Sequence, residues 1–144
     1  MDTEGNLGAG LMKSAPRILI VDDEQAVRRT LRQILIRAGY PSVVEAADGE
    51  SALARLRREH FDIVITDVQL PVMSGLHLLV QVSREFPRIA IVIMTGFAAL
   101  HPRQQVQALG PVEYLPKPLD PRAVEAVLAK FRPAASTAKT APVL

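Results

Sequence analysis

Short apolar runs alternate along the chain with segments whose apolar residues recur every three or four positions. The runs are rich in β-branched residues and are bounded by polar or turn residues, which is typical of strands buried on both faces of a sheet. One of them contains a glutamate and is more mixed, so we expect that strand nearer an edge of the sheet. The predicted strands are Arg17–Val21, Ser42–Ala46 (the mixed one), Phe61–Asp67, Ile89–Met94 and Val112–Leu115.

The segments between these runs have the spacing and end signals of amphipathic helices. Gly39 is a predicted C-cap, Asp48 a predicted N-cap, and Asp120-Pro121 an N-cap followed by a first-turn proline. The predicted helices run from Gln25 to Gly39, from Asp48 to near His60, from Leu76 to Glu85 before Pro87, from about Pro102 to Leu109, and from Asp120 to Phe131.

Five strands alternating with five helices predict a doubly wound α/β fold. Short connections imply right-handed crossovers, a parallel sheet and helices on both of its faces. Residues 16–132 form this one domain. Residues 1–15 and 133–144 lack apolar periodicity, so we expect flexible tails at both ends.

The composition excludes several classes of protein. Apolar residues make up 49% of the 144 residues, but no run approaches the roughly 18 apolar residues of a membrane span. Cysteine is absent, which excludes disulfides and thiolate metal sites, and the N-terminus lacks a secretory signal. The net charge of +2 gives no reason to expect nucleic-acid binding. We therefore expect a cytoplasmic protein without membrane insertion.

Polar residues with reactive side chains follow the predicted strands. They are Asp22 and Asp23, Asp67, Thr95 and Lys117. Because the carboxyl ends of parallel strands lie at one edge of the sheet, where ligands bind in open α/β folds, we expect these side chains to converge. A structural alternative for Asp67 is that it caps the next helix or the turn.

Converging carboxylates repel one another unless a cation joins them, and an oxygen-only ligand set favours Mg²⁺. An aspartate is a competent phosphoryl acceptor. The hydroxyl of Thr95 and the ammonium of Lys117 are donors suited to the equatorial phosphoryl oxygens. The pattern therefore favours phosphoryl transfer to an aspartate.

Residues 17–132 resemble the receiver domain of two-component response regulators. The resemblance rests on motifs in a fixed order: Asp22-Asp23, Asp67 with Leu70-Pro71 and Met73-Ser74-Gly75, Met94-Thr95-Gly96, and Tyr114-Leu115-Pro116-Lys117-Pro118. It implies a flavodoxin-like sheet with strand order 2-1-3-4-5.

The resemblance also implies roles for residues. Asp67 would take a phosphoryl group from a phosphohistidine of a sensor histidine kinase or a histidine phosphotransfer protein. Asp22, Asp23, Asp67 and the backbone carbonyl of Gln69 would hold Mg²⁺. Lys117 would pair with the phosphoryl group, while Thr95 and Tyr114 would act as switch residues that alter a face for a downstream protein target. Such a protein catalyses only its own phosphorylation and dephosphorylation.

Three other interpretations stay open. An aspartate-nucleophile phosphatase would carry a second acid where Gln69 stands, and the first loop of a flavodoxin-like cofactor binder would not carry the acidic Asp22-Asp23-Glu24. Within the receiver class, we expect a stand-alone regulator, because only twelve residues follow residue 132. The alternative is a fragment of a longer DNA-binding regulator or hybrid kinase.

The remaining charged residues have ordinary explanations. Arg28, Arg29 and Arg32 lie largely outside the apolar side of their helix and are expected to form a solvated face, or to steer an acidic partner.

Gly110-Pro111 and Pro102 depart from the usual receiver pattern, which leaves the partner surface less defined than the site.

Overall fold

The computed structural model describes residues 15–70, 72–96 and 112–131. It contains a five-stranded parallel sheet in the order β2-β1-β3-β4-β5. The predicted parallel sheet and strand order are confirmed, and the mixed strand β2 lies at an edge as expected. The strands are β1 (Ile18–Val21), β2 (Val43–Ala46), β3 (Ile63–Asp67), β4 (Ala90–Thr95) and β5 (Val112–Pro116).

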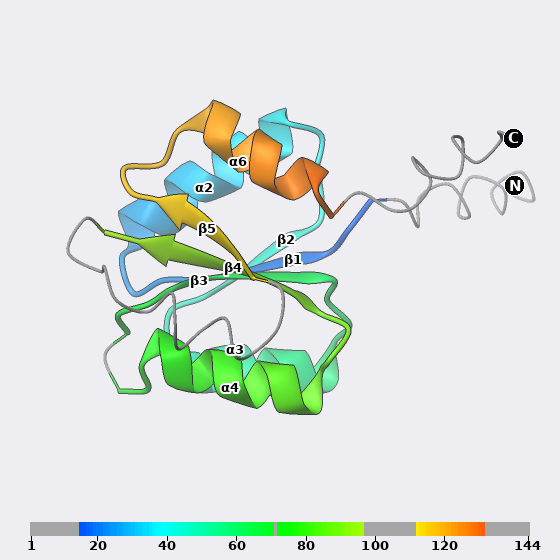
Figure 1. The fold of residues 1–144 in the computed structure, drawn as a ribbon, viewed down its shortest axis with the longest axis vertical. Coiled ribbons are helices and arrows are strands. Elements are labelled where there is room, and N and C mark those ends of the chain that lie inside the picture. The colour runs from blue at the N-terminus through cyan, green and yellow to red at the C-terminus, as the bar shows by residue number, and fades with distance from the viewer. Residues whose placement is uncertain (1–14, 71, 97–111, 132–144) are drawn as a thin grey trace, which may run out of the picture.

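Helices cover both faces of the sheet. Figure 1 shows α2 (Gln25–Arg37) and α6 (Pro121–Ala129) on one face, and α3 (Gly49–Arg58) and α4 (Gly75–Glu85) on the other. The doubly wound α/β fold is thus confirmed, with four helices in the described part of the chain. The predicted helix from about Pro102 to Leu109 lies outside the described residues, as do Pro71, Gly110-Pro111 and most of both predicted tails.

The helix ends follow local capping chemistry. Gly39 comes just after the end of α2 with φ 98°, a left-handed conformation that favours glycine. The side chain of Asp48 accepts from the Ser51 N–H at 2.7 Å, and that of Asp120 from the Arg122 N–H at 3.1 Å. Both predicted N-caps are confirmed.

Most predicted boundaries differ from the structure by one or two residues, and two of these differences have a local explanation. Helix α3 ends at Arg58 instead of near His60, because Glu59 already has an extended backbone. Strand β3 begins at Ile63, two residues after the start of the predicted run at Phe61. Phe61 is nevertheless buried, so its apolar character reflects packing and not membership of the strand.

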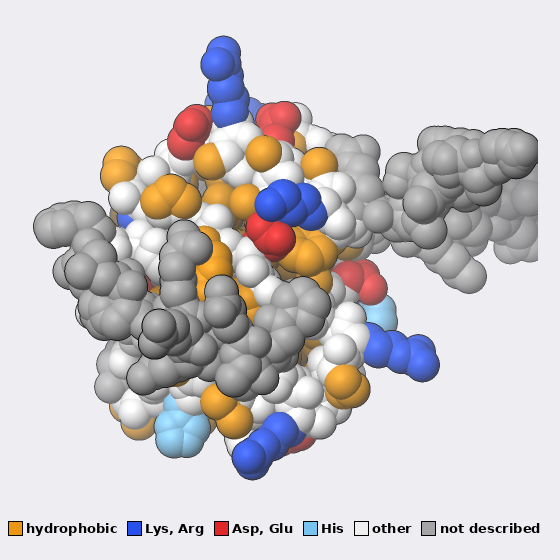
Figure 2. Space-filling view, viewed as in Figure 1, with side chains coloured by type: hydrophobic (Ala, Val, Ile, Leu, Met, Phe, Trp, Pro, Cys, Tyr) orange, Lys and Arg blue, Asp and Glu red, His pale blue; other side chains and the backbone are white. Residues whose placement is uncertain are grey.

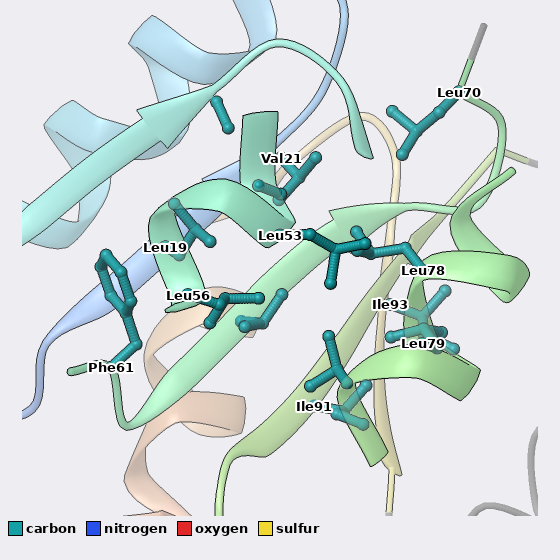
Figure 3. Packing of buried hydrophobic residues seen from close by; sticks show 14 residues of the cluster. Leu19, Val21, Leu53, Leu56, Phe61, Leu70, Leu78, Leu79, Ile91 and Ile93 are labelled. Atoms are coloured by element: carbon teal, nitrogen blue, oxygen red, sulfur yellow. The ribbon is translucent and has the colours of Figure 1, made fainter. Parts of the chain in front are cut away.

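Side chains that alternate along the strands divide the core into two layers. Leu19 and Val21 of β1 pack in the layer under α3 and α4, whereas Ile18 and Ile20 pack in the layer under α2 and α6. Figure 3 shows the first layer, where leucines of α3 and α4 meet the strands. Burial on both faces explains why the central strands are almost purely apolar.

Charged groups are distributed over the surface without a single-sign patch on the described part of the face in Figure 2. Basic side chains there stand among acidic, apolar and neutral ones. Within the described residues, no helix combines the length and the apolarity that a membrane crossing needs.

Candidate functional site

The carboxyl edge of the sheet brings the predicted reactive residues together. Asp22 directly follows β1, Asp67 ends β3, Thr95 ends β4 and Lys117 directly follows β5. Strand β3 lies between β1 and β4, so the ends of these elements are adjacent in space. The expectation that the strand ends converge is therefore correct.

Lys117 joins two of the aspartates. Its Nζ donates to Asp22 Oδ2 at 3.0 Å and to Asp67 Oδ2 at 2.9 Å. The side chains of Lys117, Asp67 and Asp22 are 21%, 13% and 0% exposed. The backbone N–H of Lys117 donates to the carbonyl of Thr95 at 2.8 Å, which fixes the start of the segment that carries the ammonium.

The electrostatics of the site follow from this burial. Burial raises the pKa of Asp22 above its ordinary value, although the Glu24 N–H and the Lys117 ammonium both act in the opposite direction. Burial alone would lower the pKa of Lys117, but its hydrogen bonds to Asp67 and Asp22 outweigh that effect and the pKa is raised. Lys117 is therefore held in its charged form between two carboxylates.

The third aspartate completes an oxygen-rich cluster. Asp22, Asp23 and Asp67 each offer a carboxylate oxygen, and these oxygens lie within 4.8 Å of one another. Asp23 is exposed, whereas Asp22 is fully buried, so the cluster opens to solvent on the side of Asp23. A set of carboxylate oxygens at this spacing fits a hard divalent cation such as Mg²⁺.

Asp67 also contacts the loop that follows β3. Its Oδ1 accepts from the Gln69 N–H at 3.0 Å, so the expected contact with the turn exists beside the contact with Lys117. The next helix is capped by Ser74, whose hydroxyl accepts from the His77 N–H at 3.1 Å. The alternative in which Asp67 caps that helix is therefore wrong.

Comparison with known proteins identifies the family of this chain. A profile of the response regulator receiver domain matches residues 18–129. The chain belongs to this family. It is a receiver domain of two-component signalling.

Relatives of this receiver domain fall into two groups. It is 33% identical over 116 residues to the response regulator protein FleR of Pseudomonas aeruginosa, and the match covers 81% of this chain but 24% of FleR. It is 31% identical over 117 residues to the sporulation initiation phosphotransferase F of Bacillus subtilis, covering 81% of this chain and 94% of that protein. The chain thus spans only 24–45% of the length of FleR and of two transcriptional regulators that it matches.

Solved receiver structures superpose on this one. The chemotaxis protein CheY4 of Vibrio cholerae has a TM-score of 0.74 and 31% identity, with 81% of this chain and 98% of that chain covered. A CheY-like receiver domain protein of Methanospirillum hungatei has a TM-score of 0.74 and 34% identity, covering 81% and 93% of the two chains.

The two predicted switch residues share one face of the receiver sheet. Tyr114 is half-buried, pairs in register with Ile93 of β4, and packs against the core layer under α3 and α4. Thr95 lies two residues after Ile93, so it projects from the same face. Thr95 is partly exposed, and its hydroxyl makes no hydrogen bond within the described residues.

The predicted metal ligand Gln69 is exposed and lies in the loop after β3. The contact that the structure shows is its N–H on Asp67, and the predicted role of its carbonyl stays a prediction.

Two groups near Asp67 did not emerge from the sequence as site residues. Thr66 is fully buried and its hydroxyl donates to the Asp67 carbonyl at 3.0 Å. Gly75 lies so close to Asp67 and Val68 that a Cβ there would collide with the Asp67 carbonyl oxygen. This close approach gives a physical reason for the glycine in the motif that carried the resemblance.

The expectation of a solvated arginine face on α2 is wrong for Arg28, whose side chain is 15% exposed, whereas the Arg32 side chain is 41% exposed. Arg28 and Arg32 both bind the carboxylate of Glu45 on β2, at 3.1 Å and 3.0 Å. Arg28 also donates to the backbone carbonyl of Asp22 at 2.7 Å. The available signal was Glu45 itself, a charged residue within an otherwise apolar strand.

Proposed function

We propose that Asp67 is the phosphoacceptor of this receiver domain and that a phosphohistidine supplies the phosphoryl group. The donor would be a sensor histidine kinase or a histidine phosphotransfer protein. The observation that carries the proposal is the position of the Lys117 ammonium, 2.9 Å from Asp67 and 3.0 Å from Asp22. Because the ammonium contacts both carboxylates, it can keep its contact with Asp22 while Asp67 reacts, and so stays close to the phosphoryl group.

Phosphoryl transfer depends on the positioning of the reacting groups and on charge stabilisation more than on covalent catalysis. A carboxylate oxygen of Asp67 forms a bond to phosphorus while the phosphorus–nitrogen bond of the donor breaks, and its electron pair returns to the imidazole. Lys117 keeps its contact with Asp22 and donates to a phosphoryl oxygen in place of the Asp67 carboxylate. Attack of water on phosphorus later restores the carboxylate and releases inorganic phosphate, so the domain acts only on its own phosphoryl group.

A divalent cation fits the oxygens of this site. Asp22, Asp23, Asp67 and the Gln69 carbonyl would hold Mg²⁺, which when bound neutralises charge on the phosphoryl oxygens. The oxygen-only donor set, with carboxylate oxygens within 4.8 Å of one another, supports this assignment.

The output of the domain would be a change of surface read by a downstream protein. Thr95 would turn toward the phosphoryl group, and Tyr114, which projects from the same face of the sheet, would respond to the space that this movement leaves. The pairing of Tyr114 with Ile93, two residues before Thr95, supports the route because it places the two side chains on the same face of the sheet.

The relatives support two arrangements for the whole protein. The match over 94% of the sporulation phosphotransferase F favours a regulator made of one receiver domain, with residues 16–132 as the domain and 1–15 and 133–144 as tails. The match to only 24% of FleR favours a receiver joined to output domains.

Phosphorylation by acetyl phosphate tests the proposal. With Mg²⁺, intact-mass measurement should show one base-labile phosphoryl group on the wild type and none on Asp67→Asn. Asp48→Asn is the matched control, because asparagine replaces the N-cap of α3 with little loss of capping and the residue lies outside the cluster. Equal labelling of Asp67→Asn, or labelling that persists in EDTA, contradicts the proposal.

A further inference from the structure

The acid cluster is supported by an arginine from outside the strand ends. Arg28 lies in the first turn of α2, with its side chain 15% exposed. Its Nη1 donates to the carbonyl of Asp22 at 2.7 Å and its Nε to Glu45 Oε1 at 3.1 Å. The guanidinium therefore bridges the turn after β1 to the edge strand β2.

The carbonyl that Arg28 holds belongs to the peptide linking Asp22 to Asp23. The residues before and after this peptide have other restraints, since the Asp22 N–H donates to the Ala46 carbonyl at 3.2 Å and Asp22 Oδ1 accepts from the Glu24 N–H at 2.8 Å. Rotation of the peptide plane would turn the Asp23 side chain. Asp23 is exposed, and within the described residues its carboxylate makes no hydrogen bond or ion pair. The backbone around this peptide is therefore what sets the point from which the Asp23 side chain reaches the cluster.

Glu45 sets the direction of the arginine. Its second oxygen, Oε2, accepts from Arg32 at 3.0 Å, so the carboxylate is held between two cations and presents Oε1 to Arg28. A planar guanidinium with several donors at fixed angles can bond this carboxylate and the Asp22 carbonyl at once.

We propose that Arg28 is a positioning residue of the acid cluster. Anchored by Glu45, it fixes the Asp22–Asp23 peptide and thereby keeps the Asp23 carboxylate directed toward Asp22 and Asp67, ready for a divalent cation. The inference rests on the proposed function of the cluster as a Mg²⁺ site.

The direction in which Mg²⁺ affinity changes when Arg28 is replaced distinguishes a positioning role from a purely electrostatic one. A cation near three carboxylates repels Mg²⁺, so removing the charge of Arg28 would tighten Mg²⁺ binding if charge alone mattered. Removing a group that orients the ligands weakens binding instead. Arg29, the next residue on α2, is exposed and supplies the matched control for charge.

The test is a Mg²⁺ titration of the full chain, labelled with ¹⁵N and followed through the backbone amide signals of Asp23 and Glu24. We expect Arg28→Met to raise the dissociation constant for Mg²⁺ about 10-fold, as loss of supporting groups around metal ligands commonly does. Arg29→Met should leave the constant unchanged or lower it slightly. A dissociation constant for Arg28→Met equal to or below that of the wild type overturns the proposal.

Two further variants keep the test decisive. Arg28→Lys retains the charge but lacks the planar fork, so we expect binding about threefold weaker than in the wild type. If Arg28→Met does not fold, wild-type affinity in Arg28→Lys overturns the proposal in its place. Glu45→Gln should weaken Mg²⁺ binding in the otherwise wild-type chain and have no further effect when added to Arg28→Met. An equal effect in both chains would contradict the role of Glu45 as the anchor of Arg28.

Mg²⁺ binding by the wild-type chain distinguishes failure of this inference from failure of the proposed function on which it rests. If the wild-type chain does not bind Mg²⁺ at millimolar concentrations, the cluster is not a metal site and both proposals fail. If the wild type binds and Arg28→Met binds equally well, only the positioning role fails.

Discussion

At the scale of single residues, the ammonium of Lys117 balances two carboxylates of very different exposure. Asp22 is fully buried, and burial has raised its pKa, so its charged form depends on the groups around it. A carboxyl whose pKa is raised on folding stabilises the protein below its unfolded pKa and loses that contribution as pH rises. The raised pKa of Lys117 has the same sign, with its stabilisation lost only at strongly alkaline pH.

Replacing Lys117 by methionine keeps an apolar stem and removes both ion pairs. We expect Lys117→Met to destabilise the apo protein at pH 7 by about 2–3 kcal/mol, below the range for fully buried pairs because Lys117 is partly solvated. The loss should shrink as the pH falls, because the pKa of Asp22 is raised and its carboxyl takes up a proton. Urea unfolding of both proteins between pH 4 and 8 measures it.

Lys130→Met is the control for this variant. Lys130 pairs with Glu113 at the surface, so its replacement should change the free energy of unfolding by less than about 0.5 kcal/mol. A loss in Lys117→Met that does not change with pH would argue against the pair with Asp22 as its origin.

At the scale of elements, the junction of β3 and α4 is built by close backbone approach. Gly75 begins α4, and its N–H donates to the Val68 carbonyl at 2.8 Å. A Cβ at Gly75 would collide with the backbone of Asp67 and Val68, whereas a Cβ at Gly49, the first residue of α3, would meet the side chain of Met73. Backbone at a strand end cannot move aside as a methionine can.

The two glycines form a matched pair for mutagenesis. Gly75→Ala should destabilise the protein by about 2 kcal/mol or more and slow the phosphorylation of Asp67, because the end of β3 must shift. Gly49→Ala should stay within about 1 kcal/mol of the wild type, since Met73 can repack and alanine favours the helix. Denaturant unfolding and acetyl phosphate labelling of both variants give the comparison, and equal losses in the two would contradict the assignment.

The strands β4 and β5 connect the site to Tyr114. Thr95→Ala should still accept a phosphoryl group on Asp67 but transmit it poorly, because the hydroxyl that would turn toward the group is gone. Amide NMR with beryllofluoride, a mimic of the phosphoryl group, measures this. In the wild type we expect shifts that extend from the loops around Asp67 to Tyr114, and in Thr95→Ala shifts near Asp67 alone. Wild-type shifts that stop short of Tyr114 would rule out this route.

At the scale of the whole molecule, two apolar layers on either side of one sheet hold the site in place. Each strand contributes to both layers, so the carboxyl edge carries side chains from elements that are packed on both faces. The sequences of the predicted tails lack the apolar periodicity that offsets ordering entropy, so we expect the domain to fold without them.

Trimming the chain tests this independence. A protein of residues 16–132 should unfold within about 0.5 kcal/mol of the full chain, the range usual for changes away from packed groups, and should accept phosphate at the same rate. Thermal unfolding and intact-mass labelling of the two proteins measure it. A lower melting temperature or slower labelling of the trimmed protein would mean that a tail contacts the domain.

Local chemistry was enough to predict much of this molecule. Apolar runs without internal charge, such as Ile89–Met94, correspond to strands because burial on both faces excludes charge. Asp48 and Asp120 cap helices because their side chains reach backbone N–H groups two or three residues away. The convergence of Asp22, Asp67 and Lys117 followed from parallel topology, which places all carboxyl ends of strands at one edge.

Only the tertiary structure decided how those side chains are partnered. The sequence could not show that Asp22 is fully buried while its neighbour Asp23 is exposed, since the two are adjacent and identical in type. It also could not show that Arg28 reaches both Glu45 and the Asp22 carbonyl. Capping and periodicity depend on neighbours along the chain, whereas these contacts depend on the register and twist of strands that meet only in the folded sheet.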